Sequence, residues 1–131
     1  SKEKFLVFNT HFDHIGNLAR KESSDLILKR IDEINKENLP VILTGDFNLE
    51  DNNPIIKNIQ KYLTDVQFNI DKSNKYYGTF TGFKHSKIIE KRIDYIFVKN
   101  IKVIQSKHVH LKTPINGWAS DHHPVLTTLK F

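Results

Sequence analysis

The sequence contains no cysteine, no methionine and only one tryptophan among its 131 residues. Without cysteine, disulfide bonds and zinc sites built on thiolates are excluded, although the cellular compartment stays open. No apolar run approaches the roughly 20 residues that a helix needs to cross a bilayer. The chain also lacks internal repeats, low-complexity tracts and linkers, so we expect a single small domain over residues 1–131.

The start of the chain indicates a piece of a longer protein. It begins with Ser1 instead of methionine, has no signal-peptide pattern, and enters an apolar segment at Phe5. The composition is that of an ordinary globular protein, with 38% hydrophobic and 27% charged residues. A formal net charge of +5 suits an anionic substrate such as a phosphate ester, and it equally suits a basic surface that faces water.

The order of apolar segments predicts a mixed α/β fold. Phe5 to Phe8 is a continuous apolar run, which is typical of a buried strand. A helix is predicted over residues 17–36, because an apolar stripe recurs there at helical spacing. That stripe consists of Ala19, Ser23, Ile27, Ile31 and Ile34.

Shorter runs predict the remaining elements. Strands are expected at 41–43, 79–83, 93–98, 101–111 and 124–131, and a second helix at 55–63. We expect the strands at 93–98 and 101–111 to pair through a turn at Lys99 and Asn100. The whole pattern predicts a mixed β-sheet with helices on one face.

Two polar segments follow predicted strands. Asp46 and Asn48 in Gly45-Asp46-Phe47-Asn48 project to the same side of an extended chain. Such an Asp can bind a divalent metal or orient a water, and such an Asn can donate to a phosphate oxygen. An Asx turn after a strand is the alternative.

The segment from Ser120 to Pro124 is the second of these. Asp121 offers the oxygen ligand that Mg²⁺ prefers, and His122 can act as an acid or base near neutral pH. A polar turn before the last strand explains the same residues without chemistry.

Asp94 is the only charged residue within an apolar strand, Ile93 to Val98. A carboxylate there is costly to bury unless it is paired. A histidine partner would relieve that cost and would itself be oriented by the carboxylate. An Asp that faces outward from an alternating strand fits the pattern equally well.

The segment from Asn9 to Gly16 contains His11, Asp13 and His14, which resembles part of a zinc signature of metallo-β-lactamase-fold hydrolases. That signature needs a further histidine at the position of Asn9, which weakens the zinc hypothesis.

Four motifs together resemble the endonuclease/exonuclease/phosphatase family, and the resemblance covers nearly the whole chain. They stand in the family's order: Asn9-Thr10-His11, Gly45-Asp46-Phe47-Asn48, Arg92-Ile93-Asp94-Tyr95 and Ser120-Asp121-His122. The chain looks closest to a bacterial subgroup with a Thr-His-x-Asp-His segment and a Gly-Thr-Phe-x-Gly-Phe stretch, here Gly78 to Phe83. The resemblance implies half of a DNase I-like four-layer α/β sandwich, namely the C-terminal part of the domain.

The same resemblance implies a phosphoesterase that depends on Mg²⁺ or Mn²⁺. His11 and Asn48 are expected to contact the phosphate, Asp46 to orient the attacking water or a metal, and Asp121 to bind metal. Asp94 is expected to pair with the catalytic His122. Asn9, Arg92 and Tyr77 are the expected substrate contacts.

Other polar residues have weaker functional interpretations. Two alternatives are open for Asp13, His14 and Arg20, which are expected either to line a pocket or to begin the helix. Tyr76 and Tyr77 are expected either to stack on a substrate or to pack a loop. His108 and His110 chelate a metal or are ordinary strand residues. A basic stretch is expected either to contact phosphates or to be a loop exposed to water. It consists of Lys84, His85, Lys87, Lys91 and Arg92.

The family's principal metal-binding glutamate, which follows an asparagine, has no counterpart in this sequence. We therefore expect the missing N-terminal half to supply it, and expect this chain alone to bind metal poorly and to be inactive. The absent half would also leave an apolar sheet face exposed, which invites self-association. Two alternatives remain: an inactive binding or scaffold module of the same fold, and a zinc hydrolase that uses His11, Asp13 and His14.

Overall fold

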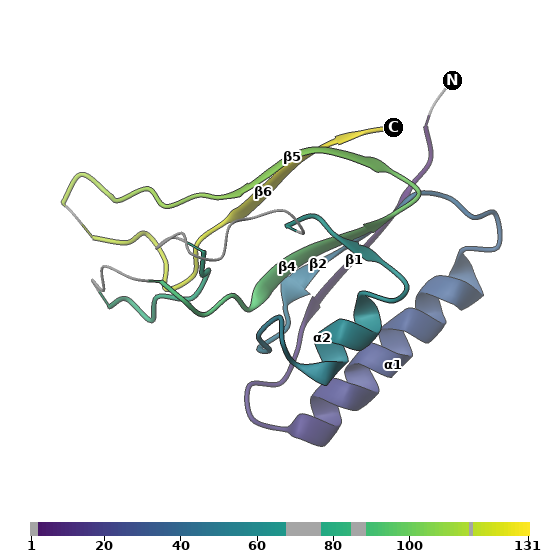
Figure 1. Cartoon of the computed structure of the whole chain (residues 1–131), viewed down its shortest axis with the longest axis horizontal. Helices are drawn as coiled ribbons and strands as arrows, with labels where there is room; N and C mark the ends of the chain where they lie inside the picture. The colour runs from purple at the N-terminus through teal and green to yellow at the C-terminus, as the bar shows by residue number, and fades with distance from the viewer. Residues whose placement is uncertain (1–2, 68–76, 85–88, 116) are drawn as a thin grey trace.

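The computed structural model describes residues 3–67, 77–84, 89–115 and 117–131. In this described part of the chain, two helices and six strands follow one another (Figure 1). No helix within these ranges is long and apolar enough to cross a membrane. The elements are β1 (Leu6–His11), α1 (Asn17–Ile34), β2 (Val41–Asp46), α2 (Pro54–Ile59), β3 (Thr64–Asp65), β4 (Asp94–Lys99), β5 (Lys102–His108) and β6 (Val125–Lys130).

The strands form two sheets. The larger has the order β1-β2-β4-β3, in which β1 and β2 run parallel while β4 runs antiparallel to both β2 and β3. The smaller is the antiparallel pair β5 and β6. The prediction of a mixed sheet is therefore confirmed.

Both helices cover the same face of the larger sheet. Ile31 of α1 and Ile56 of α2 pack in one buried cluster with Leu43 of β2 and Phe97 of β4, and Phe47 lies at its centre. Pro54 begins α2 and the Asn53 side chain accepts a hydrogen bond from the backbone N–H of Ile55, which caps that helix. The helices lie on one side of the sheet and the β5–β6 pair on the other (Figure 1).

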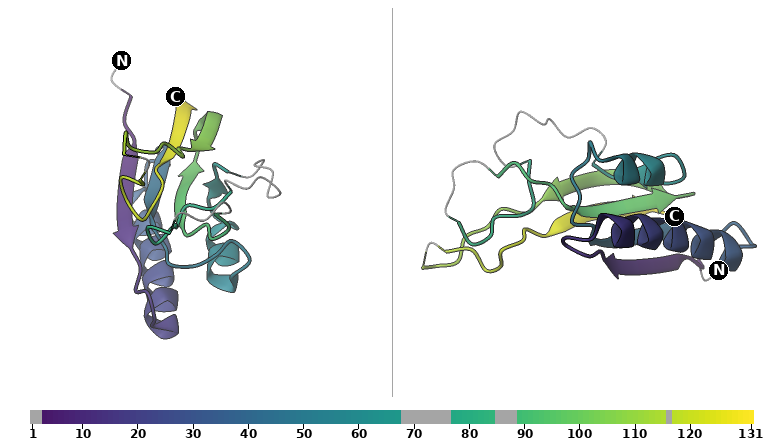
Figure 2. Two further views of the ribbon diagram at one scale, coloured as in Figure 1. Left: turned by 90° about the vertical axis from the view of Figure 1, so that its left-hand side faces the viewer. Right: turned by 90° about the horizontal axis from the view of Figure 1, so that it is seen from below.

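One face of β1 remains largely uncovered. Val7 is 57% exposed, although it is an apolar residue of a strand. The ring of Phe5 lies 4.9 Å from that of Phe131, so the beginning of β1 and the end of β6 are neighbours (Figure 2). Both rings are about half exposed.

The predicted pairing of the strands around Asn100 is wrong. β4 pairs with β2 and β3, whereas β5 pairs with β6 in the other sheet. The chain does turn there, with a positive φ of 56° at Asn100, and the turn leads from one sheet to the other.

Several predicted boundaries also differ. The buried face of α1 contains Arg20, Ser24 and Ile31, while Ile34 of the predicted stripe is 58% exposed. The helix predicted over 55–63 ends at Ile59 and is followed by the short strand β3. The strand predicted at 79–83 is reduced to an isolated bridge between Phe80 and His122.

Candidate functional site

Three polar side chains meet where β1 and β2 end and β4 begins. In the sheet register His11 lies beside Asp46, and Asp46 lies beside Asp94. Tyr95 and Phe97 of β4 point into the core under the helices. Because side chains alternate along a strand, Asp94 points to the opposite face. The order of the strands thus gathers residues that are far apart in the sequence.

Gly45 allows β1 and β2 to approach closely at this point. A Cβ atom on Gly45 would lie 2.1 Å from the backbone oxygen of Thr10, which is far too close. Only glycine fits here, because any side chain would push β1 away. The glycine before Asp46 therefore sets the distance between the two strand ends.

Asp46 and Asn48 are held together by local hydrogen bonds. The backbone N–H of Asn48 donates to Oδ1 of Asp46 over 2.8 Å. The Asn48 carboxamide donates to the backbone oxygen of Phe12 over 2.9 Å, and more weakly to Oδ2 of Asp46 over 3.4 Å. Asn48 has a φ of 51°, a left-handed conformation that asparagine tolerates better than most residues. Its side chain therefore has one defined position beside the carboxylate.

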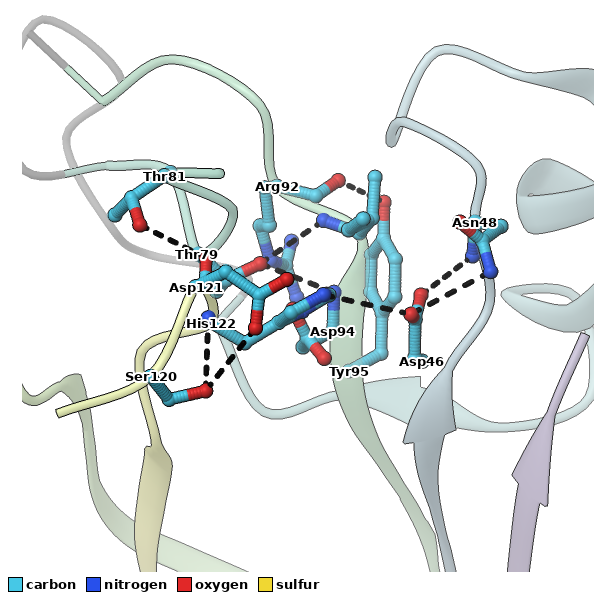
Figure 3. Close-up of polar contacts among 12 residues, drawn as sticks. Asp46, Asn48, Thr79, Thr81, Arg92, Asp94, Tyr95, Ser120, Asp121 and His122 are labelled. Carbon is cyan, nitrogen blue, oxygen red and sulfur yellow. Dashed lines mark hydrogen bonds and ion pairs between the residues drawn. The ribbon is translucent and has the colours of Figure 1, made fainter. Parts of the chain in front are cut away.

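His122 connects the two carboxylates. Its Nδ1 lies 2.8 Å from Oδ2 of Asp94, and its Nε2 lies 3.8 Å from Oδ2 of Asp46 (Figure 3). His11 approaches Asp46 from the other side, with 3.4 Å between its Nε2 and Oδ2 of Asp46. The contact between Asp94 and His122 is the pairing that the sequence predicted. We call Asp46, Asp94, His122, His11 and Asn48 the carboxylate–histidine cluster.

The segment that contains Thr79 fixes two parts of this cluster. The hydroxyl oxygen of Thr79 accepts hydrogen bonds from the backbone N–H groups of Ile93 and Asp94, both over 3.1 Å. Its backbone oxygen accepts one from His123 over 2.7 Å. Since Thr79 is fully buried, it ties the start of β4 to the loop that presents His122. The next residue, Phe80, packs its ring 5.0 Å from that of His122.

Arg20 is a structural residue whose importance the sequence pattern did not reveal. Its side chain is nearly buried, and its NH1 group donates to the backbone oxygens of His14 and Asn48 over 3.2 and 3.3 Å. It also donates to the Asn17 side chain and to the backbone oxygen of Ile15. Arg20 therefore ties the loop after β1 to the loop after β2. The only signal for it was a charged residue next to the expected apolar stripe.

The pKa values of the central residues are shifted. Burial raises the pKa of Asp46 and the charge of Asp94 adds to this, although the hydrogen bond from Asn48 and the two histidines oppose it. Burial lowers the pKa of His122, but the hydrogen bond and charge of Asp94, together with the charges of Asp46 and Asp121, outweigh burial and raise it. The cluster thus favours a protonated His122 between two acidic groups.

Three of these residues offer atoms that could bind one ion. A ligand atom from each of Asp46, Asp94 and His122 lies within 4.8 Å of the others. Carboxylate oxygens suit hard cations such as Mg²⁺ and Mn²⁺. A protonated His122 does not bind a cation, so the carboxylates of Asp46 and Asp94 are the groups that fit such an ion. They fill only part of the six positions of an octahedral Mg²⁺ site, and the cluster therefore fits the ion as part of a larger ligand set.

Asp121, the other predicted metal ligand, does not join that group of three. Its Oδ1 instead accepts a hydrogen bond from the Ser120 hydroxyl over 3.3 Å, and its backbone oxygen accepts one from Thr81. Asn9 lies on β1 at some distance from the cluster, where its side chain accepts a hydrogen bond from Thr44.

Arg92 and Tyr77, predicted as substrate contacts, are not brought to the cluster. Arg92 is 3% exposed and forms an ion pair of 2.5 Å with Asp65, and its guanidinium group lies 4.3 Å from the centre of the Tyr95 ring. The hydroxyl of Tyr77 donates to Asp51 over 2.7 Å, so this ring packs a loop. Asp65 and Asp51 thus engage the two groups in this structure, and their contact with substrate stays a prediction.

The residues of the zinc hypothesis point in different directions. Asp13 accepts hydrogen bonds from the backbone N–H groups of Ile15 and Gly16, which fixes a turn. His14 lines the pocket beside Asn48. Within the described ranges, no group of potential ligands contains His11, Asp13 and His14 together.

The remaining weaker predictions have mixed outcomes. His110 packs its ring against that of His123 at 4.4 Å, and His108 lies next to it, so these rings belong to an aromatic cluster with Trp118. Lys84 and Lys91 are exposed. Tyr76, His85 and Lys87 lie outside the described residues.

Two pockets flank the carboxylate–histidine cluster. One of about 410 Å³ lies between the larger sheet and the start of β6, and Asp94 and His122 line it. The other, of about 360 Å³, lies beside Asn48, and Phe80 and Lys91 line it as well. The cluster therefore has open space on both sides.

Comparison with known proteins gives the context for this geometry. Residues 4–122 match the endonuclease/exonuclease/phosphatase family. The mannosyl-6-phosphatase of Bacteroides thetaiotaomicron is similar in structure, with 33% identity and a TM-score of 0.77, over 95% of this chain and 51% of that chain. An endonuclease/exonuclease/phosphatase family protein from the same organism has 32% identity and a TM-score of 0.78, over 94% and 48% of the two chains. No curated protein matches the sequence.

A more distant structure shares the fold alone. TDP2 of D. rerio, solved with a single-strand DNA product, is 20% identical with a TM-score of 0.74, over 95% of this chain and 56% of that chain. The chain spans about half the length of the structures it matches. Its mixed sheet with helices on one face is DNase I-like, as predicted. Because the family pattern matches residues 4–122, the chain belongs to the endonuclease/exonuclease/phosphatase family.

Proposed function

We propose that the whole protein is a phosphoesterase that depends on Mg²⁺ or Mn²⁺ and hydrolyses a phosphodiester or phosphomonoester with an activated water. The observation that supports this most is the meeting of Asp46, Asp94 and His122 from three separate segments of the chain. In this proposal residues 1–131 are the C-terminal part of one endonuclease/exonuclease/phosphatase domain.

Each residue of the cluster has a role in this proposal. Asp94 orients His122 and supports its positive charge, so that His122 holds or transfers a proton at the reacting phosphate. Asn48 uses one N–H on Phe12, while its other N–H makes only the long 3.4 Å contact with Asp46, which a phosphate oxygen would replace. His11 is exposed beside Asp46 and supplies a further donor.

Asp46 is the residue that both the sequence and the geometry favour as a metal ligand. A bound Mg²⁺ or Mn²⁺ would act as a Lewis acid that stabilises negative charge on the phosphate. Asp121 stays a predicted ligand, because its negative charge acts on His122 while its carboxylate lies outside the group of three. The remaining ligands are expected from the other half of the domain.

The dependence on a second half also follows from the uncovered face of β1. Val7 and Phe5 present apolar surface there, and an N-terminal half of the domain would cover it. The proposal therefore expects the 131-residue chain alone to be inactive and to self-associate.

The experiment is an assay of the full-length protein beside residues 1–131. Release of product from bis(p-nitrophenyl) phosphate and p-nitrophenyl phosphate is measured with Mg²⁺, with Mn²⁺ and with EDTA. We expect turnover by the full-length protein only, and its loss in EDTA. In the full-length protein Asp46→Ala and His122→Ala should lower kcat/KM about a thousandfold or more, because each removes a group that acts on the reacting phosphate.

Asp32→Ala is the matched control, because Asp32 is an exposed acidic residue of α1 far from the cluster. It should leave kcat/KM within about twofold. Wild-type protein without turnover on either ester would favour the binding or scaffold module, and mild losses in Asp46→Ala and His122→Ala would refute the residue roles.

A further inference from the structure

The pocket beside Asn48 has a chemistry of its own. It measures about 360 Å³ and is lined by His14 of the loop after β1, by Asn48, Leu49, Glu50 and Asn52 of the loop after β2, and by Phe80 and Lys91. Leu49 is buried and forms an apolar part of the wall. We call this space the Glu50 pocket.

The Glu50 pocket adjoins the carboxylate–histidine cluster through two shared residues. Asn48 hydrogen-bonds to Asp46, and Phe80 packs against His122. A phosphate held at the cluster would therefore have the group esterified to it within reach of this pocket. In the proposed reaction that group is the alcohol that leaves.

The polar side chains of the pocket are available for such a group. Within the described part of the chain, the side chains of Glu50, Asn52 and Lys91 take no part in a hydrogen bond or ion pair. A carboxylate, a carboxamide and an ammonium offer both acceptors and donors, as several hydroxyl groups on one molecule require. Phe80 adds an aromatic surface against which the C–H groups of a ring can pack.

The charges of the Glu50 pocket argue against a nucleic acid as its occupant. Glu50 offsets the charge of Lys91, and His14 can add at most one positive charge, so the pocket lacks the excess of cations that a run of nucleic-acid phosphates needs. A carboxylate also repels a second phosphate group. A volume of about 360 Å³ lies at the small end of ligand pockets and suits a single sugar ring.

We infer that the Glu50 pocket binds the uncharged, polyhydroxylated part of a sugar phosphate monoester, with Glu50 and Asn52 accepting or donating hydrogen bonds to its hydroxyls. This inference rests on the proposed phosphoesterase function, and it names the class of substrate for the same site. Glu50 and Asn52 are thereby specificity-determining residues, whereas the cluster acts on the phosphate.

The test compares three esters in the full-length protein with its metal. Mannose 6-phosphate fills the pocket with hydroxyls, p-nitrophenyl phosphate offers a flat ring without hydroxyls, and the p-nitrophenyl ester of thymidine 5′-phosphate represents a nucleotide diester. Glu50→Gln should lower kcat/KM for mannose 6-phosphate at least about tenfold, because a site built for hydroxyls depends on its polar partners. It should leave p-nitrophenyl phosphate within about twofold.

Glu37→Gln is the matched control, since Glu37 is an exposed glutamate after α1, and it should change neither value. Asn52→Ala should follow Glu50→Gln in direction. Equal losses on both monoesters, or no loss on either, would overturn the inference, as would a wild-type preference for the nucleotide diester.

A binding measurement separates failure of the pocket from failure of the proposed chemistry. Calorimetry measures the binding of mannose 6-phosphate to the Asp46→Ala variant. The measurement is then repeated with the double variant that carries Asp46→Ala and Glu50→Gln. If no ester is turned over by wild type but Glu50→Gln weakens this binding at least about tenfold, the proposed chemistry fails and the pocket assignment stands. If Glu50→Gln leaves this binding unchanged, the pocket assignment fails whatever the turnover.

Discussion

Two buried arginines mark where single residues were hardest to predict. Arg20 was grouped with polar residues at a helix start and Arg92 with a basic stretch, yet both are nearly buried. A hydrophobicity pattern predicts that a charged residue is exposed to water, because burying a charge is costly. The partner of Arg92, Asp65, lies far along the chain, so no local pattern contains it. The contact of Arg20 with Asn48 is also distant. Arg20 has local partners as well, which the apolar stripe of the helix does not indicate, namely His14, Ile15 and Asn17.

Arg20→Met should destabilise the full-length protein by about 1–3 kcal/mol, because several part-buried backbone oxygens lose their donor. It should also lower kcat/KM, since Asn48 loses one of the contacts that hold its loop. Urea unfolding and the p-nitrophenyl phosphate assay measure the two effects.

The control for this change is Arg30→Met on the same helix. Arg30 is exposed and forms a surface ion pair with Glu33, a contact of little energetic value. Its loss should change the free energy of unfolding by less than about 1 kcal/mol. Similar losses for Arg20→Met and Arg30→Met would show that Arg20 is not a structural tie.

At the scale of elements, β4 is the centre of the arrangement. It lies between β2 and β3 in the sheet and begins with Asp94 at the cluster. The sequence predicted its position within one residue, as its apolar run is clear. It did not predict its partners, because the residues that follow, Asn100 and β5, look like the second half of a hairpin.

The ion pair between Asp65 and Arg92 joins β3 to the segment before β4. Asp65→Ala should destabilise the full-length protein by about 3–5 kcal/mol, since it leaves the Arg92 charge buried without its partner. Asp25→Ala is the control, because Asp25 is the acidic partner of an exposed pair with Lys21 and should cost less than about 1 kcal/mol. Thermal or urea unfolding gives both values.

This experiment also tests the original prediction for Arg92. If Arg92 bound substrate and Asp65 only oriented it, Asp65→Ala would raise KM and leave the free energy of unfolding nearly unchanged. That outcome would contradict the structural role. Loss of stability with an unchanged KM for p-nitrophenyl phosphate is the expected result.

At the scale of the whole molecule, the rings of His110 and His123 make stability depend on pH. Burial, together with smaller effects of the neighbouring His110 and His122, lowers the pKa of His123 to about 4. Burial also lowers the pKa of His110, which a hydrogen bond with Gly78 partly opposes. The unfolded chain therefore takes up protons more readily than the folded one below pH 6.5.

The contribution of these two histidines to the free energy of unfolding should consequently be complete above pH 6.5, and it should be lost as the pH drops toward 4. The raised pKa of His122 acts in the opposite sense, since a protonated His122 favours the folded state. His123→Phe isolates the first effect and should flatten the fall between pH 7 and pH 5 in urea unfolding of the full-length protein. A fall as steep as in wild type would contradict the assignment, and His14→Asn, at an exposed histidine, serves as the control.

The sequence predicted the mixed sheet and the residues of the cluster more successfully than the assembly of the whole. The family resemblance paired Asp94 with His122 in advance, whereas the apolar strand around Asp94 indicated only that a buried carboxylate there would need a partner and left an outward-facing Asp equally open. The layered packing of β5 and β6 over the larger sheet, and the exclusion of Asp121 from the group of three, depend on contacts between segments with no common pattern.

The close approach at Gly45 has a consequence for how members of this family diverge. Gly45 and the fully buried Phe47 are required by the packing of β1, β2 and the core, whereas Asp46 and Asn48 contribute polar groups at the surface of the cluster. A descendant that lost its chemistry but kept its shape would stay under selection for the glycine and the phenylalanine, and in part for Asn48, whose left-handed backbone and hydrogen bond to Phe12 also serve the fold. In such a lineage Asp46 is the position that should change first, so an inactive relative could be told from an active one by a single residue between two that persist.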